Sequence, residues 1–251
     1  MSRFALLIEY DGSQYHGWQI QKADPTIQQH LEDAMQQLTQ QSVRIIGSGR
    51  TDTGVHARGQ VAHFDSPRED FTAEIYRRGL NANLPDDILV KACVSVSDDF
   101  HARFDAKRRD YQYTMTMNPR ALGRQYAWSV RGSLDVTLLQ QTAEFVEGTH
   151  DFTSFMSARS DIENTRCHII KSSWKIGSKR LRYFGCGDRF LHNMVRCLVG
   201  TMVEVARGRY TMDEFRQFID EPDKKAPVVR APAHGLVLDK VHYPGEIFPR
   251  K

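Results

Sequence analysis

Residues 4–39, FALLIEYDGSQYHGWQIQKADPTIQQHLEDAMQQLT, join a strand pattern to a helix pattern. Residues 4–10 are mostly apolar and end at the turn-forming sequence Asp-Gly-Ser, which predicts a strand. In residues 26–39 apolar side chains recur every three or four positions, which predicts a helix with one buried face; these side chains are Ile27, Leu31, Met35 and Leu38. A strand followed by a helix is how a βαβ-type fold begins.

The rest of the chain continues this alternation. In the first half, two short strands flank a glycine-rich loop, and a helix at residues 72–80 and a strand at residues 89–96 complete a split βαβ order. The second half repeats it, with strands predicted at 111–117, 168–176, 182–186 and 236–242 and helices at 135–146 and 190–206. An additional short helix at 211–219 is expected to pack through Phe215, Phe218 and Ile219.

This order predicts an α/β (α+β) fold of two ferredoxin-like βαββαβ halves, related by a pseudo-two-fold axis. We expect a mostly antiparallel mixed sheet with helices on one face and a central cleft, since clefts between halves are usual ligand sites. No Gly/Ser-rich or Pro-rich linker separates the halves, so residues 1–105 and 106–251 form adjoining domains. The first carries a candidate catalytic loop, and the second completes the cleft.

Composition narrows the protein class only slightly. The 251-residue chain has a formal charge of +3, which does not by itself indicate a polyanionic partner. Its four cysteines, Cys93, Cys167, Cys186 and Cys197, show no C-x-x-C spacing, so we expect free, buried thiols and neither a zinc site nor a disulfide framework. The chain lacks a signal-peptide pattern and a run of about 18 apolar residues, which predicts a cytoplasmic protein outside the membrane.

The segment 47–64, GSGRTDTGVHARGQVAHF, sets one carboxylate, Asp52, among three basic side chains. Arg50 lies two residues before it and is expected to keep it ionised, and His56 and Arg58 follow. An ionised carboxylate can act as a nucleophile. We expect Gly47, Gly49 and Gly54 to adopt positive φ or to allow a ligand close to the backbone. The alternative is a tight turn in which the aspartate bonds its own backbone.

Two further constellations are candidates for binding. Arg103, Lys107, Arg108 and Arg109 lead into the strand bearing Tyr111 and Tyr113; cations and a stackable ring suit RNA, although a solvated charged turn has the same composition.

The helix at 190–206 carries a second candidate. Its apolar face is expected to comprise Leu191, Met194, Val195, Leu198, Met202 and Val205, and its polar stripe Arg189, His192, Asn193, Arg196 and Gly200. Arg196 either faces solvent or faces the cleft to pair with a carboxylate. His192 has no neighbours at metal-ligand spacing, and the common nucleotide-binding and serine-hydrolase motifs are absent, so we expect no metal and no cofactor.

Together these segments resemble the tRNA pseudouridine synthase A family over nearly the whole chain. The matching pieces are YDGSQYHGWQIQ at 10–21, the Asp52 segment, GLNANLPDDI at 79–88, FHARF at 100–104, DFTSF at 151–155 and FLHNMVRCLVG at 190–200. The resemblance implies a cofactor-free homodimeric isomerase that converts uridine to pseudouridine in the anticodon arm of tRNA, at positions 38, 39 and 40. It also implies Asp52 as nucleophile, Tyr111 against the target base, Arg196 paired with the catalytic carboxylate, and Arg50 helping to flip the base. The other expected RNA contacts are His56, Arg58, Lys107 and Arg108.

Three alternatives stay open at this point. Asp52-Thr53-Gly54 also spells the D-T-G of aspartic proteases, although neighbouring arginines oppose a proton shared by two carboxylates. A non-catalytic tRNA-binding or chaperone protein would use the same basic cleft. A paralogue acting on another RNA uridine would share the chemistry and differ only in substrate.

Overall fold

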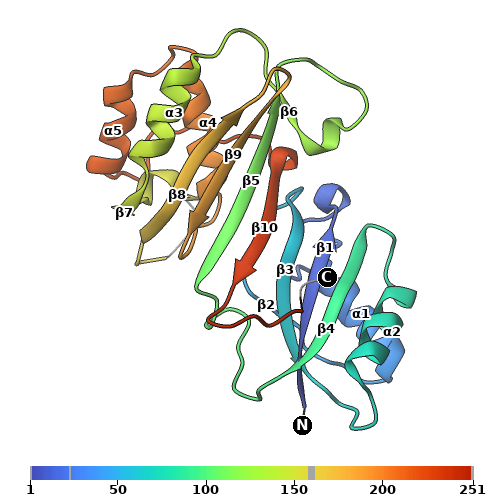
Figure 1. Cartoon of the computed structure of the whole chain (residues 1–251). Coiled ribbons are helices and arrows are strands. Elements are labelled where there is room, and N and C mark those ends of the chain that lie inside the picture. Colours follow the sequence, from blue (N-terminus) through green and yellow to red (C-terminus); the bar gives the residue numbers. More distant parts are fainter. Residues whose placement is uncertain (1, 23, 158–161, 250–251) are drawn as a thin grey trace. The chain divides into compact units, whose positions relative to one another are not determined.

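The computed structural model describes residues 2–22, 24–157 and 162–249, which fold into two units (Figure 1). Unit 1 comprises two parts of the chain, the residues up to 107 and those from 238 onward. Unit 2 comprises residues 108–237. The last strand, β10 (Leu236–His242), therefore runs from unit 2 into unit 1.

Unit 1 is built on an open sheet in the order β4-β1-β3-β10, with β2 also paired with β3. The strands that precede β10 are β1 (Arg3–Tyr10), β2 (Ile46–Gly47), β3 (His56–Asp65) and β4 (Ile88–Val96). Strand β1 pairs antiparallel with both β3 and β4, and Ala5, Leu6 and Ile8 on it are fully buried. The strands predicted at 4–10 and 89–96 are therefore confirmed.

Two helices pack on this sheet, α1 (Ile27–Thr39) and α2 (Ala73–Asn83). Each begins after a threonine whose hydroxyl accepts a backbone hydrogen bond, Thr26 from Gln29 N at 3.3 Å and Thr72 from Ile75 N at 3.4 Å. Such N-caps stabilise the first helical turn. Both predicted helices are confirmed, and α2 continues three residues past the predicted end.

The prediction of two short strands around the Asp52 loop is wrong for the second one. Strand β2 has only two residues, but β3 has ten, and eight of them are buried. Three of the buried side chains are polar: His56, Gln60 and His63. Because both faces of β3 are covered and polar groups stand at interior positions, the alternation that reveals a strand is missing from its sequence.

Unit 2 has a sheet in the order β5-β9-β8-β7, with the short β6 parallel to β5. Its strands are β5 (Arg108–Thr116), β6 (Trp128–Ser129), β7 (Gly148–Asp151), β8 (Arg166–Ile176) and β9 (Arg180–Gly187). The helices α3 (Val136–Phe145), α4 (Met194–Ala206) and α5 (Met212–Asp220) accompany it. The pairings of β5 with β9, β9 with β8, and β8 with β7 are antiparallel, so the predicted mixed α/β, mostly antiparallel class is confirmed.

The described residues also form four single 3₁₀ turns, η1 (Gly12–Gln14), η2 (Arg124–Tyr126), η3 (Thr153–Phe155) and η4 (Ala233–Gly235). The turn at Asp11-Gly12-Ser13 was predicted and corresponds to η1, whereas η2, η3, η4 and the short β6 and β7 were not predicted, because two to four residues are too few to show a period.

Helix α4 differs from the prediction in its start and in its burial. It begins at Met194 because Asn193 takes a left-handed conformation (φ 67°), which interrupts a helix. Twelve of its residues are buried, including Gly200 on the expected polar stripe. A Cβ on Gly200 would lie 2.1 Å from the carbonyl oxygen of Val229, so this glycine allows a close backbone contact. A separate polar stripe through Gly200 is therefore wrong.

All four cysteines are free, as predicted. Three are buried, whereas Cys186 is only half-buried. Burial raises the pKa of the Cys93 and Cys167 thiols to about 12, so both remain protonated near neutral pH.

Candidate active site

The loop around Asp52 is held on one side by the segment that follows β1. The amide of Trp18 donates to the carbonyl oxygen of Thr51 at 3.1 Å, and the amide of Gly54 donates to Tyr15 at 3.2 Å. A buried hydrogen bond of 2.8 Å joins the hydroxyls of Tyr10 and Thr51. The residues directly before and after the Asp52–Thr53 pair are thus fixed to the same segment.

A second set of hydrogen bonds holds the loop from strand β3. Ser48 donates from its amide to Val61 O at 2.7 Å and from its hydroxyl to Gln60 Oε1 at 2.7 Å. The Gln60 amide in turn donates to the carbonyl oxygen of Gly49 at 3.0 Å. Gln60 is fully buried, so these bonds are shielded from competing water.

Three glycines allow this packing. Gly17 has φ +86°, and a Cβ on it would lie 2.5 Å from Thr51 O. Gly54 has φ +76°, as the sequence predicts for a turn glycine. Gly47 has no positive φ, and a Cβ there would meet the Trp18 ring at 2.6 Å. The positive φ expected for Gly49 is wrong, whereas the close approach of a ligand there stays a prediction, since no protein atom lies within 4 Å of the position of a Cβ.

The candidate side chains of unit 1 differ in exposure. Asp52 is half-buried, whereas Arg50 is exposed. Arg58 is also exposed, and its guanidinium contacts Asp239 on β10 at 2.7 Å. Arg50, Asp52, His56 and Arg58 thus lie along one loop and the start of β3.

His56 is only 4 % exposed, and it contacts the η1 turn. Its Nδ1 accepts a hydrogen bond of 3.0 Å from the amide of Gly12. An ion pair with Asp11, whose Oδ1 lies 3.0 Å from the same nitrogen, would need a proton there. The Gly12 amide and the Asp11 carboxylate thus both lie against one nitrogen of the buried His56 ring, and these contacts fix the ring beside the η1 turn.

In unit 2, Tyr111 and Tyr113 share one face of β5 but differ in their surroundings. Tyr113 is fully buried, and its hydroxyl donates to Pro232 O at 2.8 Å. Tyr111 is half-buried, and its ring contacts Phe190 edge-to-face at a centroid distance of 5.1 Å. Tyr113 is therefore part of the core, and Tyr111 is the ring with surface remaining for a ligand.

Arg196 is the half-buried residue of the otherwise buried α4. Its Nε donates to Ala231 O at 2.9 Å and its Nη1 to Asn193 Oδ1 at 3.0 Å. The Ala231 amide donates back to the carbonyl oxygen of Arg196 at 3.0 Å. These contacts fix the direction of the guanidinium, which is what a two-pronged partner of a carboxylate requires.

The basic run at the unit boundary has mixed roles. Lys107 is exposed and is the last residue of this part of unit 1, while the half-buried Arg108 begins β5 in unit 2. Arg109 donates to the carbonyl oxygen of Asp188 at 2.7 Å, which ties β5 to the chain end of β9.

Sequence reasoning missed the residues that hold the Asp52 loop, namely Tyr10, Gly17, Ser48 and Gln60. Their only signal in the sequence is that all four lie in the two glycine-containing segments 10–21 and 47–64, which carry the family resemblance. Among the described residues no group of three or more His, Cys, Asp or Glu side chains is arranged to hold a metal ion. Over the same residues, no helix is both long and apolar enough to cross a membrane.

The profile of the tRNA pseudouridine synthase family matches residues 6–105 and 143–244. The chain therefore belongs to this family, and the predictions of the family and of an isomerase are confirmed. Asp52 and Arg196 lie inside the matched ranges, whereas Lys107, Arg108 and Tyr111 lie between them.

Relatives named tRNA pseudouridine synthase A match almost the full chain. The protein from an Exiguobacterium species is 40% identical over 243 residues, covering 97% of this chain and 98% of its own length. The Bacteroides thetaiotaomicron protein is 40% identical over 251 residues, covering 99% and 93% respectively. The Acetivibrio thermocellus protein is 41% identical over 245 residues, covering 97% and 100%.

Proposed function

We propose that this protein isomerises uridine to pseudouridine in the anticodon stem-loop of tRNA, at positions 38, 39 and 40, without a cofactor. The observation that carries the proposal is the full-length match to proteins named tRNA pseudouridine synthase A. It is supported by Asp52, a half-buried carboxylate in a loop whose backbone is fixed on both sides.

Asp52 is the proposed nucleophile. The reaction breaks the bond between N1 of uracil and C1′ of ribose, rotates the base, and joins C5 to C1′; C5 loses its proton and N1 takes one up. An ionised carboxylate starts this either by attacking C1′ or by removing a sugar proton. Both routes need the carboxylate at a fixed position, which the anchored loop supplies.

Three other side chains have proposed roles around Asp52. Arg196 pairs with its carboxylate, and the fixed guanidinium suits a two-pronged contact. Tyr111 stacks on the target base and assists proton transfer at C5, using the ring surface that Phe190 leaves uncovered. Arg50, exposed beside the loop, helps to extrude the nucleotide from the stem and to hold it.

The remaining proposed RNA contacts are cations near these residues. Arg58, Lys107 and Arg108 would contact phosphates, which supply much of the affinity of proteins for RNA. His56 is buried, and we propose that it acts by holding Gly12 and the start of β3 in place.

Asp52 belongs to unit 1, and Tyr111 and Arg196 belong to unit 2, so the proposed site requires both. We also propose that residues 1–105 supply the catalytic loop and that residues 106–251, of which 238–249 fold with unit 1, complete the cleft. We also propose a homodimer that acts in the cytoplasm, a compartment that suits four free cysteines.

The test is tritium release from tRNA labelled with [5-³H]uridine, because forming the new C5–C1′ bond expels the hydrogen from C5. We expect release by the wild-type protein and none by Asp52→Ala, with tRNA still bound. Asp65→Asn is the control, since this carboxylate pairs with Arg3 at 2.7 Å outside the loop. Release by Asp52→Ala at the wild-type rate would refute the role of Asp52. Binding without release by the wild-type protein would indicate a tRNA-binding protein or a different target uridine.

A further inference from the structure

Unit 2 contains two segments that have basic residues but no acidic residues. Residues 164–187 contain six Lys or Arg residues and no Asp or Glu, and residues 111–134 contain three Arg residues and no Asp or Glu. The whole chain carries a charge of only +3, with 34 basic and 31 acidic residues. These two segments therefore carry a net positive charge, whereas acidic residues nearly balance the basic residues over the chain as a whole.

The sheet brings the two segments together at the turn between β8 and β9. Gly177 N donates to Arg180 O at 3.0 Å and closes the turn, which exposes Ser178 and Lys179 at its tip. The hydroxyl of Thr116, at the end of β5, donates to Lys179 O at 3.2 Å. The turn is thereby fixed to β5, whose continuation carries Arg120.

Strand register places the charged side chains on one face. Lys175 on β8 is directly opposite Arg182 on β9, and Arg180 is two residues from Arg182 on the same strand. The alternate residues of β9, Leu181 and Tyr183, are buried. Because side chains alternate between faces, the three cations point away from the buried face of the sheet.

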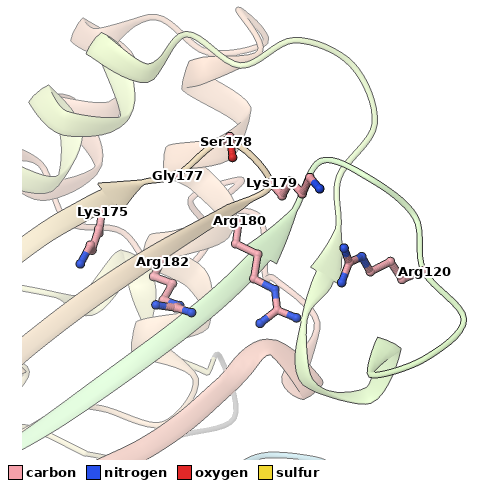
Figure 2. A pocket seen from close by; sticks show the side chains of 7 residues that line it. All are labelled: Arg120, Lys175, Gly177, Ser178, Lys179, Arg180 and Arg182. Carbon is pink, nitrogen blue, oxygen red and sulfur yellow. The ribbon is translucent and has the colours of Figure 1, made fainter.

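These cations line an open hollow of about 310 Å³ at the protein surface. Its charged lining residues form what we call the hairpin cluster: Arg120, Lys175, Lys179, Arg180 and Arg182 (Figure 2). In the part of the chain that the structure describes, no carboxylate forms an ion pair with any of the five. Five cations around one hollow repel each other, and an anion placed there removes that repulsion.

We propose that the hairpin cluster is a second RNA-binding site, which holds the phosphate backbone of tRNA away from the nucleotide that is isomerised. This proposal rests on the proposed function, in which the RNA is tRNA. It adds the place where the part of the tRNA outside the anticodon arm binds. Tyr111 pairs with Gly185 and Thr116 with Arg180, so five residues of β5, about 17 Å, separate the two positions along the strand. Arg180 and Arg182 also point from the sheet face opposite to that of Tyr111 and Tyr113. A base at Tyr111 therefore cannot occupy the cluster.

The chemistry of the lining favours phosphate over base. The residues around the cavity include no aromatic ring on which a base could stack, and besides the five cations they are Gly177 and Ser178. Arginine and lysine bind phosphate oxygens without reading sequence. The cluster thus recognises a polyanion whose phosphates are spaced along a backbone, and it supplies affinity independent of sequence.

The experiment compares full-length tRNA with an isolated anticodon stem-loop, each titrated against three proteins at several salt concentrations. The first protein is the wild type. The second carries Lys175→Gln, Lys179→Gln and Arg180→Gln, which are exposed side chains. The third is a matched control with Lys22→Gln, Arg78→Gln and Lys225→Gln, three exposed cations outside the cluster. Thermal unfolding checks that all three proteins are folded, and Lys179→Gln with Arg180→Gln is used if the triple variant is not.

We expect the Kd of full-length tRNA to rise about 10-fold at about 0.1 M salt in the cluster variant, with its salt slope reduced by about 2 to 3. The Kd of the stem-loop and the rate at saturating tRNA should match those of the control. An unchanged Kd for full-length tRNA would overturn the proposal, and so would an equal rise for both RNAs, which would place the anticodon arm itself at the cluster. The Kd measurements decide this even if the wild-type protein released no tritium, so the two proposals fail separately.

Discussion

The hydroxyls of Tyr10 and Thr51 form a buried hydrogen bond of 2.8 Å, which ties the first strand to the residue before Asp52. Tyr10→Phe removes this bond while keeping the ring, and should lower the free energy of unfolding by about 1 kcal/mol. We also expect it to reduce turnover more than tRNA affinity, because the position of the Asp52 backbone is less well fixed.

Tyr76→Phe is the matched control for this change. Its hydroxyl forms a buried hydrogen bond of 2.6 Å with Ser66 in the same unit, outside the Asp52 loop. Urea unfolding should show a similar loss of stability in both variants, whereas tritium release should fall only in Tyr10→Phe. Equal rates in the two would show that the Tyr10–Thr51 bond is purely structural.

Gly17→Ala tests the close approach between the segment after β1 and the loop. Gly17 has φ +86°, a conformation that costs alanine about 1–2 kcal/mol, and the added Cβ would lie 2.5 Å from Thr51 O. Gly132→Ala is the control, since its φ is +88° and no atom lies within 4 Å of the position of its Cβ. We expect both variants to lose stability in thermal unfolding and only Gly17→Ala to lose tritium release. If Gly17→Ala were fully active, the Asp52 loop would have to tolerate the movement of the Thr51 carbonyl that the added Cβ causes.

The helices of unit 1 could be predicted because their determinants are local. Thr26 and Thr72 are N-caps, and the apolar residues after them have helical spacing. Strand β3 could not be recognised at its full length, because its buried His56, Gln60 and His63 have partners distant in the sequence.

The candidate site divides in the same way. The density of basic side chains around Asp52 is visible in the sequence, but the bonds of Arg196 to residue 231 join positions 35 residues apart. The hairpin cluster is intermediate: its acid-free segments can be read from the sequence, whereas the strand register that places Lys175 opposite Arg182 cannot.

His63 should make stability depend on pH. Burial, together with the charges of His101 and Arg3, lowers the pKa of His63 to about 4. An unfolded histidine takes up its proton near pH 6.5, so between about pH 6.5 and 4 the unfolded chain binds a proton that the folded chain does not. The contribution of this residue is therefore complete above about pH 6.5 and is lost as the pH falls towards 4.

The measurement is urea unfolding of the wild type and His63→Asn at several pH values across this range. Asparagine cannot titrate, yet its Oδ1 can still accept the 3.1 Å hydrogen bond that the Ala102 amide donates to His63 Nδ1. The stability of the wild type should fall more steeply with decreasing pH than that of the variant. Parallel curves would assign the acid sensitivity to other groups.

Tyr111→Phe separates stacking from proton transfer at the proposed site. The phenylalanine ring keeps the edge-to-face contact with Phe190, so folding and tRNA affinity should be unchanged. If the hydroxyl takes part in proton transfer at C5, the single-turnover rate should fall about 100-fold. In the control, Tyr113→Phe loses the bond to Pro232 O and some stability but keeps its rate. A wild-type rate for Tyr111→Phe would leave this tyrosine a stacking role only.

Arg50→Ala tests whether this exposed side chain acts on the RNA. The backbone on both sides of it is fixed by the bonds of Gly49 O to Gln60 and of Thr51 O to Trp18, so the loop should keep its conformation without the guanidinium. An arginine that holds the extruded nucleotide acts after binding, and its loss should therefore reduce turnover about 100-fold while changing the Kd of tRNA little. Arg44→Ala is the control, because Arg44 is an exposed arginine of the same region that contacts Glu32 at 3.4 Å. Single-turnover tritium release at saturating enzyme measures the step directly, and a rate for Arg50→Ala equal to that of Arg44→Ala would remove Arg50 from the site.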